Sequence, residues 1–364
     1  MPKAKKFYRI NDAVFLKCGV NIKYINQFYL YLEKSRLGPF LRHTKKTFLT
    51  INKARHKIFR GSNLYFFVFL YFAVILGIMF YFGWWISPDR FIVFGLILAV
   101  IVANPFKFLK DWSPLVLLLL GYEFLRGLAP MLNAKVNIYP LINADKFLFG
   151  GHIPPIELQK WLYVPGQLHF YDFIFTILYM MHFALPLIFG FYLWTKKRER
   201  FRHFMIALLI LSYLGFITYI LYPAMPPWMA AEKGIIPQVY NIFNLGAAKF
   251  FRGGSFPSIY WMFSPNPVAA MPSLHAAYPT LVFLYLLKYF GKKMWWFSIY
   301  VFGVWFAIIY LGHHYVIDAI VGIIYAVVTF YAVESFLSWR EKKQKEAKKI
   351  QKNNQGKSET KTKV

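Results

Sequence analysis

Two histidines and an aspartate stand together in the segment GHHYVIDAIVG, residues 312–322. His314 and Asp318 are four residues apart, so their side chains would share one face of a helix. A carboxylate that accepts the proton of one imidazole nitrogen leaves the lone pair of the other nitrogen available for attack. The pair predicts a nucleophilic or basic histidine, with a helix-capping aspartate beside a packed histidine as the alternative. His313 could contact the same substrate or serve only in packing.

A third histidine follows a predicted helix start in AMPSLHAAYP, residues 270–279. Pro272 suits the first turn of a helix, and Ser273 lies among backbone amides that would otherwise lack partners. Such amides attract anions, phosphate especially. His275 would then lie beside the bound anion, which favours a general acid. An interfacial anchor is the alternative.

Two arginines are candidate phosphate ligands. Arg126 in GYEFLRG presents a planar array of donors at the end of an apolar run, and its alternative partner is Glu123, three residues earlier. Arg252 in FFRGG is followed by two glycines that would let the backbone approach a ligand. A solvated loop charge is the alternative for Arg252.

These residues together suit phosphoryl transfer through a phosphohistidine. His314 would attack phosphorus while Asp318 steadies the ring as it becomes cationic. The arginines and the helix-start amides would hold the equatorial oxygens, and His275 would protonate the departing oxygen. A hydroxyl group or water would then attack the phosphohistidine. The motifs include no acidic cluster suited to a divalent metal, so we expect a reaction without metal or cofactor.

The composition predicts an all-α integral membrane protein. Hydrophobic residues make up 58% of the 364 residues, above the roughly 45–50% that is usual for soluble domains. Several apolar runs reach about 18 residues, enough to cross a bilayer. We expect about eight transmembrane helices, at residues 64–87, 91–108, 114–131, 171–194, 204–222, 273–290, 294–311 and 315–337.

The basic residues predict the orientation of these helices. With eight spans, the basic clusters at both ends of the chain and in every second connector fall on one side, which by the positive-inside pattern is cytoplasmic. The connectors 132–170 and 223–272 then lie on the opposite face, where their many Pro, Gly and aromatic residues predict short helices and turns. All three polar motifs reach that same extracytoplasmic face. The plasma membrane is the expected location.

Three regions are expected along the chain. Residues 1–60 form a basic, aromatic region that is cytoplasmic or interfacial, residues 61–338 the polytopic membrane catalytic domain, and residues 339–364 a basic disordered tail. The basic ends contribute much of the net charge of +28. Because they flank membrane spans, we expect them to contact anionic lipid rather than nucleic acid. Cys18 is the only cysteine, so no internal disulfide can form.

The motifs PSLH and HHYVID resemble the second and third signatures of the type 2 phosphatidic acid phosphatase superfamily. The closer resemblance is to its inositol phosphorylceramide synthase-like branch, which also carries a Pro-Pro-Trp segment, here in AMPPWMA. The resemblance covers roughly residues 60–337 and implies a six-helix bundle acting on membrane lipid substrates. It also implies that His314 is the nucleophile, Asp318 its orienting carboxylate, His275 the proton donor and Ser273 a phosphate ligand.

A fourth segment, FYDFIFTILYMMHF at residues 170–183, also resembles that branch. Its Asp172, Tyr179 and His182 can share one helix face. They would line a head-group pocket, or alternatively make hydrogen bonds within the core.

The sequence also departs from the wider superfamily. Phosphatases usually carry an arginine six residues before the nucleophile, where this chain has Ile308. Their Lys–Arg-Pro first motif is absent, and GYEFLRG substitutes for it only in part. Both departures favour a phosphotransferase that moves a phospho-head group to a lipid acceptor. A lipid phosphate or polyprenyl pyrophosphate phosphatase, with water as the acceptor, is the alternative. A transporter is disfavoured, because the polar residues gather mainly at one rim instead of along a path.

Overall fold

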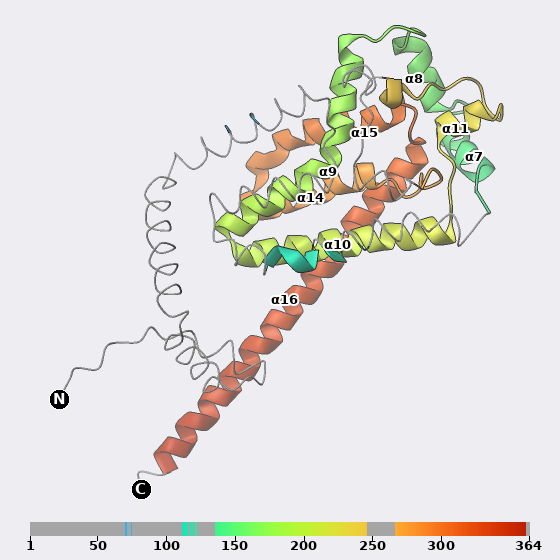
Figure 1. Ribbon diagram of the computed structural model, residues 1–364. Coiled ribbons are helices and arrows are strands. Elements are labelled where there is room, and N and C mark those ends of the chain that lie inside the picture. The colour runs from blue at the N-terminus through green and yellow to red at the C-terminus, as the bar shows by residue number, and fades with distance from the viewer. Residues whose placement is uncertain are drawn as a thin grey trace, which may run out of the picture. The chain divides into compact units, whose positions relative to one another are not determined.

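A computed structural model gives the structure of the chain, and it describes residues 135–245 and 266–361 together with positions 70, 74, 111–115, 117, 118 and 121. The chain divides into two compact units, Met1–Tyr71 and Phe72–Val364. All of these positions except Leu70 lie in the second unit, and they are helices joined by turns (Figure 1). The described ranges contain no strand, only two isolated bridges that join Ala224 to Asn137 and to Ala269. The predicted all-α class is therefore confirmed.

Four helices in the described ranges are long and apolar enough to cross a membrane. They are α9 (Phe170–Lys196), α10 (Arg198–Leu221), the η2–α15 pair (Lys292–Phe297 and Ser298–Tyr310) and the membrane part of α16 (Val316–Lys361). This confirms a multi-pass membrane protein. The first three predicted spans fall almost wholly outside the described residues, so the number eight stays a prediction.

The 17-residue helix α14 (Leu274–Phe290) is the centre of this bundle. It packs against α9, α10, α15 and α16 (Figure 1). Ser273 caps its first turn and Gly291, with φ +81°, ends it, as the residue types favour.

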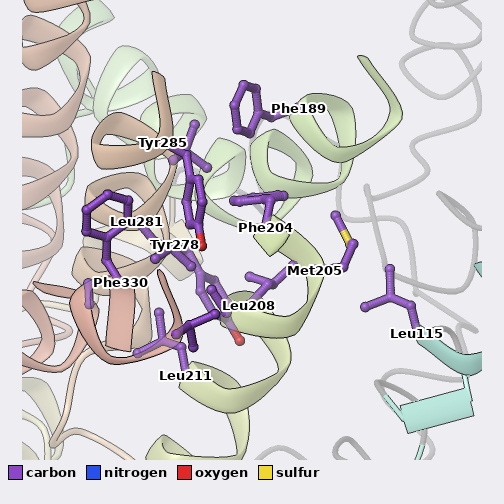
Figure 2. Close-up of a cluster of buried hydrophobic side chains, with 14 of the residues drawn as sticks. Leu115, Phe189, Phe204, Met205, Leu208, Leu211, Tyr278, Leu281, Tyr285 and Phe330 are labelled. Atoms are coloured by element: carbon purple, nitrogen blue, oxygen red, sulfur yellow. The ribbon is translucent and has the colours of Figure 1, made fainter. Parts of the chain in front are cut away.

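The main core lies where α14 meets α9, α10 and α16. Figure 2 shows buried aromatic and aliphatic side chains from the four helices interdigitating, among them Phe189, Phe204, Leu211, Leu281, Tyr285 and Phe330. Within a bilayer the lipid tails are as apolar as these side chains, so close packing provides the stabilisation. The core fixes α14 relative to its neighbours.

Short helices lie in both long connectors, as predicted. They are α7 (Tyr139–Leu148), α8 (Pro154–Leu162) and α11 (Pro227–Glu232). Each begins with proline in its first turn, a position where the missing N–H costs nothing. Leu141, Ile156 and Ala230 from these helices form a second apolar cluster with Tyr315, just before α16. The connectors are thus packed against the end of the bundle where α16 begins.

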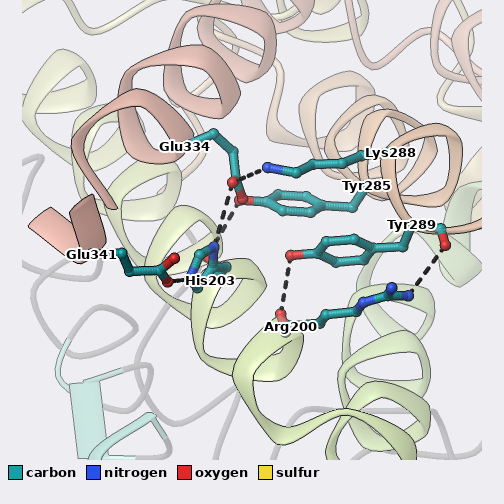
Figure 3. A network of polar contacts seen from close by, with 7 residues as sticks. All are labelled: Arg200, His203, Tyr285, Lys288, Tyr289, Glu334 and Glu341. Carbon is teal, nitrogen blue, oxygen red and sulfur yellow. Dashed lines mark hydrogen bonds and ion pairs between the residues drawn. The ribbon is translucent and has the colours of Figure 1, made fainter. Parts of the chain in front are cut away.

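A polar network lies among α10, α14 and α16, at the end of the bundle away from the start of α16. Figure 3 shows its side chains. His203 lies 3.4 Å from Glu334 and 3.2 Å from Glu341, measured from Nδ1 to Oε2 and from Nε2 to Oε1. Lys288 forms an ion pair with the buried Glu334. The hydroxyl of Tyr285 donates to the carbonyl of His203 over 3.3 Å. The network joins α10, α14 and α16 where the apolar core ends.

Helix α16 continues well beyond the predicted membrane span. It reaches Lys361, past residue 339, where the predicted basic tail begins. The segment REKKQKEAKKIQK consists mostly of good helix formers. An existing helix can also be extended without the cost of a new nucleus.

Candidate active site

His314 lies in the short turn between α15 and α16. The backbone amides of His313 and His314 both donate to the carbonyl of Ile308, over 3.2 and 3.1 Å. Gly312 adopts φ +81°, and a Cβ at this position would come within 2.5 Å of the Tyr240 carbonyl oxygen. Both the dihedral and the close approach require glycine. The turn leaves His314 only 3% exposed.

Asp318 lies beside His314 and also caps α16. Its Oδ2 is 3.5 Å from His314 Nδ1, and the same oxygen accepts the Tyr315 amide over 2.9 Å. Neither His314 Nδ1 nor Asp318 Oδ1 has a hydrogen-bond partner within the described part of the chain. The Asp318 side chain therefore fits both interpretations of its spacing from His314. It caps a helix, and it lies where a carboxylate that orients His314 would lie.

His275 faces the other nitrogen of His314. Its Nδ1 is 3.0 Å from His314 Nε2, and the two rings share a hydrogen bond. Ser273 Oγ accepts the Ala276 amide over 3.4 Å as the cap of α14. The Ser273 amide donates to the Asp318 carbonyl over 3.0 Å, which ties the starts of α14 and α16 together. The structure thus brings His275 together with His314 and Asp318, although His275 is 39 positions from His314 in the sequence.

Two further predicted residues pack against His275, and a third, His313, contacts one of these two. The ring of His275 has its centroid 4.4 Å from that of Tyr179 and 4.1 Å from that of His182. Tyr179 Oη lies 3.4 Å from Nδ1 of His313. Tyr179 and His182 are brought into the cluster by the face they share on α9, and His313 by the turn before α16.

Asp172 has a different place. One oxygen accepts the His169 amide over 2.7 Å and caps α9, while the other accepts the hydroxyl of Tyr310. The carboxylate is fully buried and joins α9 to α15. This is the core hydrogen bonding that the sequence allowed as an alternative to lining the pocket. Arg126 and Arg252 lie outside the described residues.

Three polar side chains near the site have no signal in the motifs: Gln159 and Asp145 are buried, and Asn241 is half-buried. Asn241 Oδ1 lies 3.0 Å from His313 Nε2 and holds that ring from the side opposite Tyr179. Gln159 Nε2 donates to the carbonyls of Tyr240 and Tyr310, over 2.9 and 2.8 Å, and its Oε1 accepts the Tyr240 amide. Asp145 accepts two amides of α16. For Gln159 and Asp145, the one available signal in the sequence was a polar residue type among the apolar residues of a short helix.

Burial sets the charge state of the two adjacent histidines. It lowers the pKa of His314 from 6.5 to about 3 and that of His313 to about 3, the latter helped by the neighbouring His314. Both rings are neutral at pH 7, because a desolvated imidazolium is unfavourable. A neutral His314 carries the lone pair that a nucleophile needs. Within residues 135–245 and 266–361, no three His, Cys, Asp or Glu side chains converge as a metal site.

The comparison with known proteins assigns this arrangement to a family. The sequence profile of the PAP2 superfamily matches residues 140–332, and the chain belongs to that superfamily. The resemblance drawn from the motifs is thereby confirmed.

Particular relatives are also similar to this chain. The phosphoinositol dihydroceramide synthase of Bacteroides thetaiotaomicron is 31% identical over 227 residues, which are 58% of this chain and 71% of the relative. The catalytic subunit of inositol phosphorylceramide synthase from Schizosaccharomyces pombe is 28% identical over 33% of this chain and 29% of its own length. Inositol phosphorylceramide synthase of Candida albicans is 25% identical over 42% of this chain and 33% of its own length. The chain thus spans about a third of these fungal relatives. No solved structure matches it significantly.

Proposed function

We propose that this protein is a membrane phosphotransferase that moves the phosphoinositol group of an inositol phospholipid onto the hydroxyl of a ceramide-type lipid. The relatives named as phosphoinositol dihydroceramide and inositol phosphorylceramide synthases support the substrates. The observation that carries the chemistry is the 3.0 Å contact between His314 Nε2 and His275 Nδ1, with Asp318 behind His314.

The reaction proceeds in two displacements at phosphorus. In the first, His314 Nε2 bonds to phosphorus as the bond to the donor lipid oxygen breaks, and His275 gives that oxygen a proton. In the second, the ceramide hydroxyl gives its proton to His275 and attacks phosphorus, and the bond to Nε2 breaks. Asp318 stabilises the positive charge that the His314 ring carries in between. Ser273, Arg126 and Arg252 are the proposed ligands of the phosphoryl oxygens, with Tyr179, His182 and His313 lining the head-group side.

Entry of the substrate must separate the two histidines. Reacting atoms lie about 3–3.5 Å apart before bond formation, so a phosphate cannot fit between nitrogens 3.0 Å apart. His314 is buried and held by its turn, whereas His275 is partly exposed. The His275 side chain is therefore the one that moves, and it ends beside the leaving oxygen.

The test uses purified protein in lipid nanodiscs with an inositol phospholipid that carries labelled inositol. With dihydroceramide present, we expect label in a phosphoinositol sphingolipid. With 1-deoxydihydroceramide, which lacks the accepting hydroxyl, that product should be absent. Release of labelled inositol phosphate at the same rate with either lipid would instead make the protein a hydrolase that uses water. The His314→Asn variant should be inactive while retaining its elution volume in size-exclusion chromatography.

The proposed orientation places the site at the extracytoplasmic face of the plasma membrane, with both termini in the cytoplasm. It is supported by the basic connector between α9 and α10, which lies at the end of the helices opposite His314. In a Cys18→Ser background, the exposed positions Lys233 and Lys197 offer a matched pair for cysteine substitution. An impermeant maleimide should label Lys233→Cys in intact cells and Lys197→Cys only after lysis. The reverse pattern would invert the topology.

A further inference from the structure

Asp145 is a fully buried carboxylate that the proposed chemistry does not use. It lies in α7, in the connector before α9. Its Oδ2 accepts the amide of Val316 and its Oδ1 accepts the amide of Ile317, each over 3.0 Å. These are first-turn amides of α16, and such groups have no partner within their own helix. A residue about 170 positions earlier in the chain therefore caps the helix.

Asp145 and Asp318 share the start of α16 between them. Asp318 accepts the preceding amide, that of Tyr315, through the oxygen that lies 3.5 Å from His314 Nδ1. Three consecutive amides are thus bound by two carboxylates. Because Asp145 serves the second and third, Asp318 can turn one oxygen to Tyr315 and remain beside His314.

We propose that Asp145 is a positioning residue for phosphoryl transfer: it fixes the first turn of α16 so that Asp318 stays aligned with His314. The inference rests on the proposed function for its kinetic readout. The packing around Asp145 agrees with this role. Leu141 and Ile142 from α7 are buried in one cluster with Tyr315, which directly follows His314. Polar and apolar contacts of α7 therefore both reach residues 315–317.

The test compares Asp145→Asn with the wild type in the dihydroceramide assay. An amide side chain has one acceptor oxygen and one donor NH2, so it can satisfy only one of the two backbone amides. We expect kcat to fall about tenfold to a hundredfold, since a displacement of about 1 Å can have an effect of that size. The KM for the donor lipid should change less than about threefold. Hydrogen exchange should rise in the peptide that covers residues 315–319 and stay unchanged in α9 and α10.

Two further variants complete the test. Asp145→Glu keeps both acceptor oxygens and should recover part of the lost kcat. Lys288→Met removes a partner of the network at the other end of the bundle and should lower stability with kcat unchanged. An unchanged kcat in Asp145→Asn, or a rise in KM alone, would overturn the inference. So would faster exchange throughout the bundle in both Asp145 variants, because Asp145 would then support the whole fold. Failure of the proposed function would appear separately, as wild-type protein without transferase activity, and the exchange experiment would still report on Asp145.

Discussion

The amide of Ser273 donates a hydrogen bond to the carbonyl of Asp318 over 3.0 Å, so the helix that carries His275 is fastened directly to the helix that carries Asp318. The contact is possible because the two backbones approach closely at Gly322. A Cβ at Gly322 would lie 2.2 Å from the Ser273 carbonyl oxygen. The relative position of the proposed acid and the proposed carboxylate thus depends on a glycine one turn beyond the site.

Gly322→Ala should therefore separate α14 from α16 and lower the activity of the protein. We expect transferase activity to fall roughly tenfold to a hundredfold and overpacking to cost about 1–3 kcal/mol of stability. Gly303→Ala in α15 is the matched control, since its Cβ would meet only the flexible end of Leu178 at 3.2 Å. Product formation and thermal unfolding of both variants provide the measurement. Equal activity in the two variants would show that the close approach is dispensable.

His275→Ala should slow the reaction in a way that depends on the leaving group. Loss of a general acid typically costs about 10²–10⁴-fold in rate, but a leaving group of low pKa departs without a proton. We therefore expect a large loss with an inositol phospholipid and a much smaller one with a nitrophenyl phosphoinositol ester. The rates of the first displacement, followed for both donors, give the comparison. A loss of the same size for both donors would show that His275 does not act as the acid.

The lowered pKa values of His313 and His314 predict a loss of stability in acid. The pKa of His313 is about 3 in the folded protein and about 6.5 when unfolded, so the unfolded state binds more protons between these values. The stabilising effect of keeping His313 neutral is complete above pH 6.5 and is lost as the pH falls from 6.5 toward 3. Thermal unfolding at pH 7.5 and pH 4.5 should show a smaller acid-induced drop for His313→Gln than for the wild type.

The comparison between the wild type and His313→Gln isolates the contribution of His313 to the pH dependence of stability. Burial raises the pKa of Asp145 to about 6, which favours the folded state at low pH and so has the opposite sign. That contribution is present in both proteins and cancels in the difference. An identical drop in the two proteins would contradict the assignment of the shift to His313.

Lys288→Met should lower stability without lowering activity. Glu334 would lose its ion-pair partner while its buried carboxylate stays near His203. Hydrogen bonds to charged groups contribute about 1.5–3 kcal/mol, and since the Lys288 side chain is 35% exposed we expect about 1–2 kcal/mol. Thermal unfolding and kcat, measured beside the exposed control Lys233→Met, test this. A fall in kcat without a fall in stability would mean that the network acts on the site.

The residues that gather at the proposed site were easier to predict from the sequence than the residues that hold them in place. His275, His314 and Asp318 could be found because imidazole and carboxylate groups are conspicuous at the ends of apolar runs. Five of the predicted spans coincide with helices, namely α9, α10, α14, α15 and the first part of α16, because apolar length is a local property. Arg126 and Arg252 remain predictions.

The supporting residues depend on contacts between distant segments. Gln159 and Asp145 act on backbone groups 81 or more positions away, which no periodicity encodes. For Asp172, the sequence predicts the position on a helix face but not the hydrogen-bond partner in another helix. Its place on the face of Tyr179 was predictable, but its bond to Tyr310, 138 positions away, depends on how α9 meets α15. The length of α16 was not among the predictions, because a basic composition suggests a solvated tail, although the same lysines and glutamates favour helix.

The bond between Asp145 and α16 has a consequence for biosynthesis. Val316 is 171 residues downstream of Asp145, so a ribosome must make every residue between them before the carboxylate meets its amides. Until then the backbone amides that Asp145 binds do not exist, and the reaction centre cannot assemble. Ribosome-bound chains that stop before residue 318 should accordingly be inert, however well their earlier helices have entered the membrane.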